Sequence, residues 1–220
     1  MKKTILSFVV IASLLTACKE SRKEKVAINQ AQKVAVTVAE LNNVDTSVSV
    51  LNWKGTKPGG AHNGTVALKS GSLSLENGVL KAGEFVIDMQ TITNVDMKGS
   101  DGAVGIEGHL KSADFFDIAT YPTSTFIITN VEDVQGKLAV TGNLQIKEIT
   151  KSITIAAAIS TENDVTVFKS EIFTIDRAVF NVKYKSKSFF SLKELKDKFV
   201  DDLIEMSFVV KTKATPKTKG

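Results

Sequence analysis

The chain has 220 residues, of which 43% are hydrophobic, with 14 glycines, 3 prolines, one cysteine and a formal net charge of +4. This composition is typical of a globular protein, and so small a charge does not favour nucleic acid as a partner. A single cysteine excludes a disulfide within the chain and a thiolate metal site, so a hydrophobic core has to stabilise the fold.

Residues 1–17 have the pattern of a secretory signal. Lys2 and Lys3 come first, an apolar run over residues 5–15 follows, and small residues stand just before Cys18. The apolar run is too short to span a bilayer. The segment ending at Cys18 resembles a bacterial lipobox, which implies cleavage before this cysteine and acylation of its thiol and new amino group. Two or three acyl chains anchor a protein stably, so we expect Cys18 to attach the chain to a membrane. An ordinary signal peptide with an incidental cysteine is the alternative.

Residues 18–43 predict a lipidated flexible tether. The segment from Lys19 to Lys25 is highly charged and has no apolar anchor, and the alternating valines over residues 34–38 allow only a weak early strand. No aspartate follows Cys18, which by resemblance to enterobacterial sorting rules argues against retention at the inner membrane. We expect a lipid-anchored protein of the bacterial cell envelope, at the outer membrane, facing either the periplasm or the cell surface.

From Val44 on, the sequence predicts an all-β domain over residues 44–213, with a disordered tail at 214–220. Apolar and polar residues alternate with a period of two through successive segments, as in antiparallel sheets. Turn signals at Asn77-Gly78, Gln135-Gly136 and Glu162-Asn163-Asp164 separate the segments. About eight strands at this spacing favour a sandwich or a closed barrel. Residues 102–117 and 192–199 break the alternation and predict one or two short helical insertions.

The usual signatures of catalysis are absent from the sequence. His62 and His109 are far apart, and no set of ligands has the spacing of a zinc site. There is no nucleophile elbow, phosphate loop or dinucleotide fingerprint. Asp114 and Asp117 flank two phenylalanines, but a carboxylate pair in a turn is usually solvated or capping. The pattern favours binding over catalysis and predicts neither a metal nor a cofactor.

Five segments in order resemble the YceI-like family. Residues 53–64 match a W-x-G-x-K…H-x-G opening, residues 83–92 a second block, and residues 108–117, followed by Tyr121-Pro122, the most specific piece. Residues 140–144 and 173–180 complete the set. The resemblance covers about Val44 to Lys213. Glu148 stands where the family usually has glycine, and residues 102–105 are less charged than the usual helix there.

This resemblance implies an extended, lipocalin-like antiparallel β-barrel that binds an isoprenoid-type amphiphile, such as a polyprenyl phosphate or a quinone, for transport, storage or sequestration. An eight-stranded barrel is wide enough for one small ligand when its inward side chains leave room. A packed barrel that acts as a protein-interaction module in envelope stress is the alternative. An enzyme on isoprenoid lipids is less favoured, because His62 is the sole polar candidate. A homodimer is compatible with the sequence.

The candidate ligand contacts share the apolar parity of their strands or lie near a barrel mouth. They are Trp53, His62, Phe85, Ile87, Met89, Phe115, Phe116, Phe126, Ile128, Leu138, Val140, Phe173 and Ile175. Their strand neighbours of opposite parity should be mostly exposed; these are Glu84, Asp88, Thr125, Lys137, Thr141 and Thr174. For Trp53 the sequence leaves two interpretations open, a residue of the packed core or a ligand contact. His62 could bond either a head group or the backbone.

Overall fold

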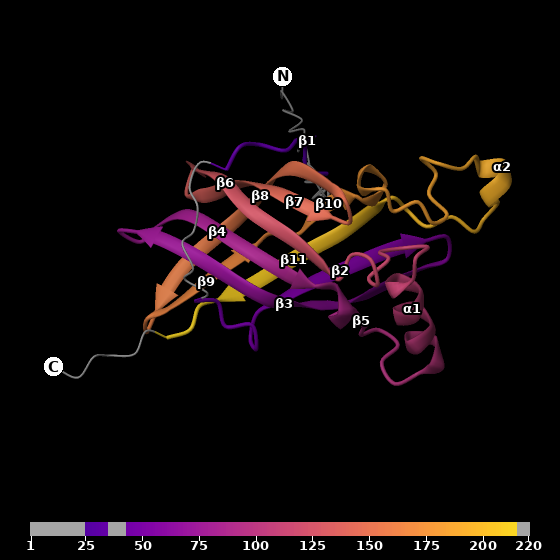
Figure 1. Ribbon diagram of the computed structural model, residues 1–220, viewed down its shortest axis with the longest axis horizontal. Coiled ribbons are helices and arrows are strands. Elements are labelled where there is room, and N and C mark those ends of the chain that lie inside the picture. Colours follow the sequence, from indigo (N-terminus) through magenta and orange to yellow (C-terminus); the bar gives the residue numbers. More distant parts are fainter. Residues whose placement is uncertain (1–24, 35–42, 215–220) are drawn as a thin grey trace, which may run out of the picture.

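The computed structural model describes residues 25–34 and 43–214. The predicted signal, Cys18 and the tail from residue 215 on lie outside the described residues. Within the described ranges, eight antiparallel strands close into a barrel, as predicted (Figure 1). In pairing order around the barrel they are β2 (Val50–Lys57), β3 (Gly60–Glu76), β4 (Val79–Asp88), β6 (Thr123–Val134), β7 (Lys137–Ile146), β8 (Ile149–Glu162), β9 (Val165–Ser170) and β11 (Leu203–Lys211), which returns to β2.

Three predicted turns form the hairpins at one end of this barrel. Asn77-Gly78, Gln135-Gly136 and Asn163-Asp164 all have positive φ at both residues. Two consecutive positive φ angles give the turn a twist that matches the strands it joins, and Asn, Asp and Gly adopt them at the least cost. The sequence therefore identified these connections correctly.

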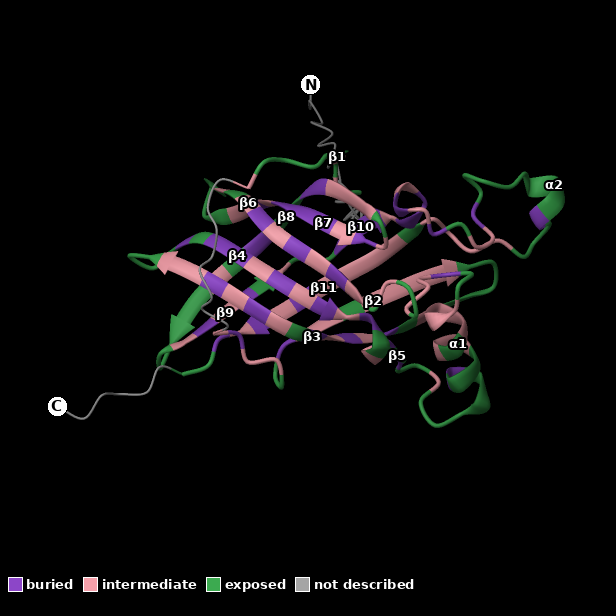
Figure 2. Cartoon of the chain, viewed as in Figure 1, coloured by how far each residue is buried: buried purple, intermediate pink, exposed green. Residues whose placement is uncertain are grey.

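Inward and outward residues alternate along the strands as predicted (Figure 2). Eight of the candidate contacts were expected to point into the barrel by their strand parity. Seven of them are buried and Leu138 is half-buried; the seven are Phe85, Ile87, Phe126, Ile128, Val140, Phe173 and Ile175. Of the six residues expected to be mostly exposed, Lys137 alone is exposed and four are intermediate, so that expectation was too strong. Thr174 departs furthest from it, because it is buried at 4% exposure. Its backbone is covered by a segment that the sequence did not place on the barrel.

That segment, residues 25–30, lies within the predicted tether and fills a gap in the hydrogen bonding between two strands of the barrel wall. β8 pairs with β9 only from Ala157 onward, and β10 (Phe173–Asp176) pairs with β11. Between them, the Val26 N–H donates to the Thr174 carbonyl at 3.1 Å, and β1 (Ile28–Gln30) pairs with β8. The Lys25 ammonium also meets Asp176 at 2.9 Å. An unpaired strand edge exposes backbone donors and acceptors, and this segment satisfies part of that edge.

The barrel interior is filled at the end that carries the three hairpins. Phe168 is fully buried and packs between Phe85 and Phe208, with ring centroids 6.0 and 4.9 Å away. Phe126 extends the stack from Phe85 at 6.5 Å. Gly142 makes room for the Phe126 ring, since a Cβ there would lie 2.4 Å from its Cζ. Offset aromatic packing of this kind leaves little free space.

The irregular elements gather at the opposite end (Figure 1). They are η1 (Met89–Thr91), β5 (Thr93–Asn94), α1 (Asp101–Lys111), η2 (Arg177–Phe180) and α2 (Leu192–Leu195). The Ser100 and Ser191 side chains cap the two α-helices by accepting N–H groups of their first turns. Both helical insertions expected from the sequence are therefore present. In the part of the chain that the structure describes, no helix is long and apolar enough to cross a membrane.

Candidate functional site: an apolar cavity at one end of the barrel

A cavity of about 490 Å³ opens at the end of the barrel that carries α1, η2 and α2. Its volume lies within the range of small-molecule sites, and its lining is mainly aliphatic and aromatic. A second space of about 50 Å³ lies next to it toward the filled end. Leu51, Leu144 and Met206 line both spaces, so these three side chains lie between them.

The structure divides the candidate contacts into three groups. Seven line the large cavity: Trp53, His62, Ile87, Met89, Phe115, Phe116 and Ile175. Phe85, Phe126 and Phe173 line the narrow inner space. Ile128, Leu138 and Val140 line neither, because their strands carry them into the filled end. Contact of any of these residues with a ligand stays a prediction.

Several lining residues were missed from the sequence. Leu51 shares the parity of Trp53 on β2, and Met206 shares that of Phe208 on β11, so extending the alternation by two residues would have found both. Arg177 and Tyr184 lie in the irregular segment after β10 and gave no periodic signal.

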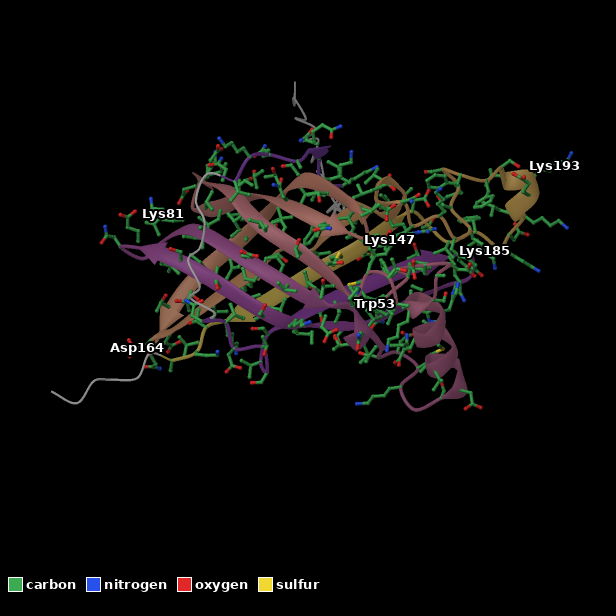
Figure 3. All side chains as sticks on the ribbon, in the orientation of Figure 1. Trp53, Lys81, Lys147, Asp164, Lys185 and Lys193 are labelled. Atoms are coloured by element: carbon green, nitrogen blue, oxygen red, sulfur yellow. The ribbon has the colours of Figure 1, made fainter. Side chains whose placement is uncertain are left out.

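Trp53 lies against the cavity because a glycine faces it on the next strand. Trp53 on β2 pairs with Gly64 on β3, and a Cβ at Gly64 would lie 2.6 Å from the indole ring and 1.8 Å from the Thr93 carbonyl oxygen. Glycine thus lets the indole and β5 approach the same point of the sheet. The buried indole Nε1 has no hydrogen-bond partner among the described residues. This donor belongs to a residue that lines the cavity; Figure 3 labels Trp53.

His62 is oriented by a carboxylate rather than by the backbone. Its Nδ1 lies 2.9 Å from Asp96 Oδ2. Asp96 also accepts the Asn63 N–H at 2.9 Å and the Asn94 amide at 2.7 Å. These hydrogen bonds, first the one from the Asn63 backbone and then the one from His62, lower the pKa of Asp96 to about 2. With Nδ1 held in this way, Nε2 is the ring nitrogen left for other partners.

An aromatic wall of His109, Phe115, Phe116 and Tyr184 forms one side of the cavity. His109 packs edge-on against Tyr184 at 4.2 Å and Phe115 at 5.8 Å between ring centroids. Phe115 and Phe116 make a T-shaped pair at 4.9 Å. The turn after α1 brings both consecutive phenylalanines to the cavity, as expected from the sequence. His109 Nε2 is buried without a hydrogen-bond partner in the described ranges.

Arg177 is the buried charge beneath this wall, at 1% exposure. Its guanidinium donates to the carbonyl oxygens of Val182 (2.7 Å), Tyr184 (2.9 Å), Val200 (2.9 Å) and Asp201 (3.1 Å). It also faces the Asp202 carboxylate at 3.3 Å. Its position 5.3 Å above the Phe115 ring adds a cation–π contact. Burial lowers the pKa of Arg177, and the nearby carboxylates oppose that change.

The mouth of the cavity is polar and carries lysines. Lys57 is the last residue of β2, and Lys185 and Lys198 belong to the segment before β11. None of these three forms an ion pair within the described part of the chain. The carboxylate of Asp201, also at the mouth, accepts hydrogen bonds from the Thr56 hydroxyl at 2.7 Å and the Lys187 ammonium at 2.8 Å. The described residues contain no group of three side chains that could hold a metal ion.

Comparison with known proteins agrees with this architecture. Residues 31–212 match the model of the YceI-like domain. The chain belongs to the YceI-like family. It is 38% identical over 56 residues to protein YceI of Salmonella arizonae and, equally, to that of Salmonella newport. That segment spans 26% of this chain and 29% of the length of each relative.

Two solved structures show the same fold. Burkholderia cenocepacia BcnA superposes with a TM-score of 0.62 at 21% identity, over 77% of this chain and 99% of BcnA. A polyisoprenoid-binding domain of Saccharophagus degradans, implicated in plant cell wall breakdown, gives 0.56 at 16% identity, over 78% of this chain and 97% of that domain. The all-β, lipocalin-like barrel expected from the sequence is confirmed.

The cavity predicts that two isoleucines of equal size differ in their contribution to stability. Ile128 lies in the filled end at 2% exposure, and Ile87 lines the cavity at 4%. Ile128→Ala should lower the free energy of unfolding by about 2–5 kcal/mol, because it leaves a new void. Ile87→Ala should cost at least about 1 kcal/mol less, since space already lies on one side of Ile87. Urea unfolding of both variants without added lipid measures the difference. Equal losses would mean that the cavity is collapsed in solution.

The hydrogen bonds at Asp96 predict a change of stability with pH. A carboxyl whose pKa falls from 3.8 unfolded to about 2 folded stabilises the protein above about pH 4, and this contribution is lost as the pH falls through that interval. Asp96→Asn should therefore be less stable than the wild type by about 1 kcal/mol at pH 7, since partial exposure weakens the charged hydrogen bonds. The gap between the two proteins should shrink between pH 4 and pH 2 in urea unfolding series. A constant gap would contradict the account.

Proposed function

We propose that this protein binds an isoprenoid-type amphiphile, a polyprenyl phosphate or a quinone, in its barrel cavity, and that it carries, stores or sequesters this lipid without transforming it. The observation that supports this is the cavity itself: an apolar space of about 490 Å³ lies at the open end, and a smaller one of about 50 Å³ lies beyond Leu51, Leu144 and Met206. An isoprenoid tail offers only apolar contact, worth about 0.8 kcal/mol for each methylene-sized group buried. Such a lining needs no catalytic group to bind it.

The polar groups of the site favour a head group at the mouth. His62, with Nδ1 bonded to Asp96, and Lys57 both lie on the β2–β3 side of the opening. Lys185 and Lys198 lie on the segment before β11. A phosphate or a quinone oxygen at this position would accept hydrogen bonds from these donors while the tail extends inward. A barrel whose interior were packed throughout, as in a pure protein-interaction module, would lack this cavity.

We further propose that the mature chain is a lipoprotein of the bacterial outer membrane, acylated on Cys18. The support is the lipobox-like sequence and the absence of any other cysteine in the chain. The anchor would keep a carrier of membrane lipids beside the bilayer from which it takes them.

Blocking the inner end of the cavity tests the ligand proposal. Leu51→Trp should weaken binding of undecaprenyl phosphate or menaquinone by at least about tenfold, because the larger ring takes up cavity volume where the two spaces adjoin. Val79→Trp is the matched control, since Val79 is 52% exposed on a hairpin at the other end. Mass spectrometry of lipid extracted from each purified protein gives occupancy, and titration gives affinity. Equal occupancy in both variants, or no prenyl lipid bound to the wild type, would contradict the proposal.

The anchor has its own test. Cys18→Ser removes the acylated thiol, so the protein should no longer receive the acyl chains of a lipoprotein. Metabolic labelling with a fatty acid and intact-mass measurement should show acyl chains on the wild type and none on the variant. An unmodified wild-type Cys18 would rule out the lipoprotein proposal.

A further inference from the structure

The segment that joins η2 to β11, here called the rim loop (residues 183–200), concentrates the charge of the protein. It contains six lysines and two acidic residues, Glu194 and Asp197, and so has a formal charge of +4, the same as that of the whole chain. The rest of the sequence therefore has no net formal charge. Figure 3 shows Lys185 and Lys193 at the end of the molecule opposite Lys81 and Asp164.

The rim loop also exposes large apolar side chains next to these lysines. Phe189, Phe190 and Leu192 are 45%, 43% and 63% exposed. They are close neighbours in sequence, unlike most of the other exposed hydrophobic residues among those described, which are single valines. The Lys183 ammonium lies 5.2 Å from the Phe189 ring centroid and forms a cation–π contact with it. An exposed apolar cluster of this kind indicates an interaction site.

Hydrogen bonds order the backbone that carries these side chains. The Phe189 and Phe190 N–H groups donate to the Ser186 carbonyl at 3.2 and 3.0 Å. Ser191 and Glu194 cap the turn of α2 that follows. Figure 1 shows α2 projecting beyond the end of the barrel. Arg177 donates hydrogen bonds to the carbonyl oxygens of Tyr184 and Val200, near the two ends of the loop, and so fixes the positions of both ends.

The same loop forms part of the cavity mouth. Tyr184, Lys185, Lys198 and Phe199 line the cavity, while Phe189, Phe190 and Leu192 do not. We propose that the rim loop docks on an anionic lipid bilayer: Phe189, Phe190 and Leu192 enter the interface and the lysines face the anionic head groups. Basic residues beside exposed aromatic rings fit this surface, because each lysine near an anionic leaflet raises the affinity about fivefold. Docking in this way would bring the cavity mouth to the bilayer.

The test uses the full chain with Cys18→Ser, so that no acyl chain contributes, and vesicles of phosphatidylglycerol and phosphatidylethanolamine. Hydrogen–deuterium exchange reads each segment separately, which separates the rim loop from any binding by the N-terminal region. Vesicles should slow exchange over residues 186–196 and leave the hairpin at 131–138 unchanged. Pure phosphatidylcholine vesicles should give much less protection.

Paired variants decide whether the exposed side chains are responsible. Phe189→Ser with Phe190→Ser should weaken the vesicle-dependent protection at least about tenfold in lipid concentration, since both rings leave the interface. Val79→Ser with Val134→Ser is the matched control, because each valine is 52% exposed at the opposite end. Lys193→Gln with Lys196→Gln should lower the affinity for anionic vesicles. No isoprenoid is needed in these experiments, so their outcome is independent of ligand binding. Unchanged exchange of the rim loop with vesicles, or equal binding by the phenylalanine variant, would overturn the proposal.

Discussion

The buried guanidinium of Arg177 is the interaction on which the open end of the barrel depends. A charge at 1% exposure is costly unless its donors are satisfied, and here backbone carbonyls from both ends of the rim loop satisfy them. The loop is therefore fixed at its base while its tip projects. Such a buried charge is poor evidence of stability by itself. Its consequence here is geometric, because it sets the wall formed by Phe115 and Tyr184 and the position of the lysines at the mouth.

The two ends of the barrel show how one fold combines stability with a binding space. At the hairpin end, phenylalanines from four strands stack on one another, and glycines such as Gly142 make room for them. At the other end, aliphatic and aromatic side chains line open space. The close packing at the filled end stabilises the fold and offsets the packing contacts that the side chains around the cavity lack. A lipid tail bound in the cavity would complete the core.

The sequence predicted the barrel well because alternation and turn residues are local signals. Asn77-Gly78 and the parity of Ile87 required no knowledge of distant neighbours. The misplaced residue, Thr174, is buried, and its carbonyl accepts the N–H of Val26, which is far away in sequence. The inner limit of the cavity could not be predicted either. Val140 and Ile87 both point into the barrel, and they differ only in their position along its axis, Val140 at the filled end and Ile87 at the open end. The contacts of Arg177 depend on irregular backbone, which has no period to detect.

Fluorescence of Trp53 is the most direct test of whether the cavity holds a lipid. It is the single tryptophan of the chain, it lines the cavity, and its buried indole nitrogen lacks a partner within the described residues. Titration of delipidated protein with menaquinone should quench this emission and saturate at one ligand per chain, and undecaprenyl phosphate should shift it without a quinone's quenching. Leu51→Trp is unsuitable for this assay, because it adds a second emitter. Emission that stays constant through both titrations would contradict the view that this barrel is a lipid-binding site.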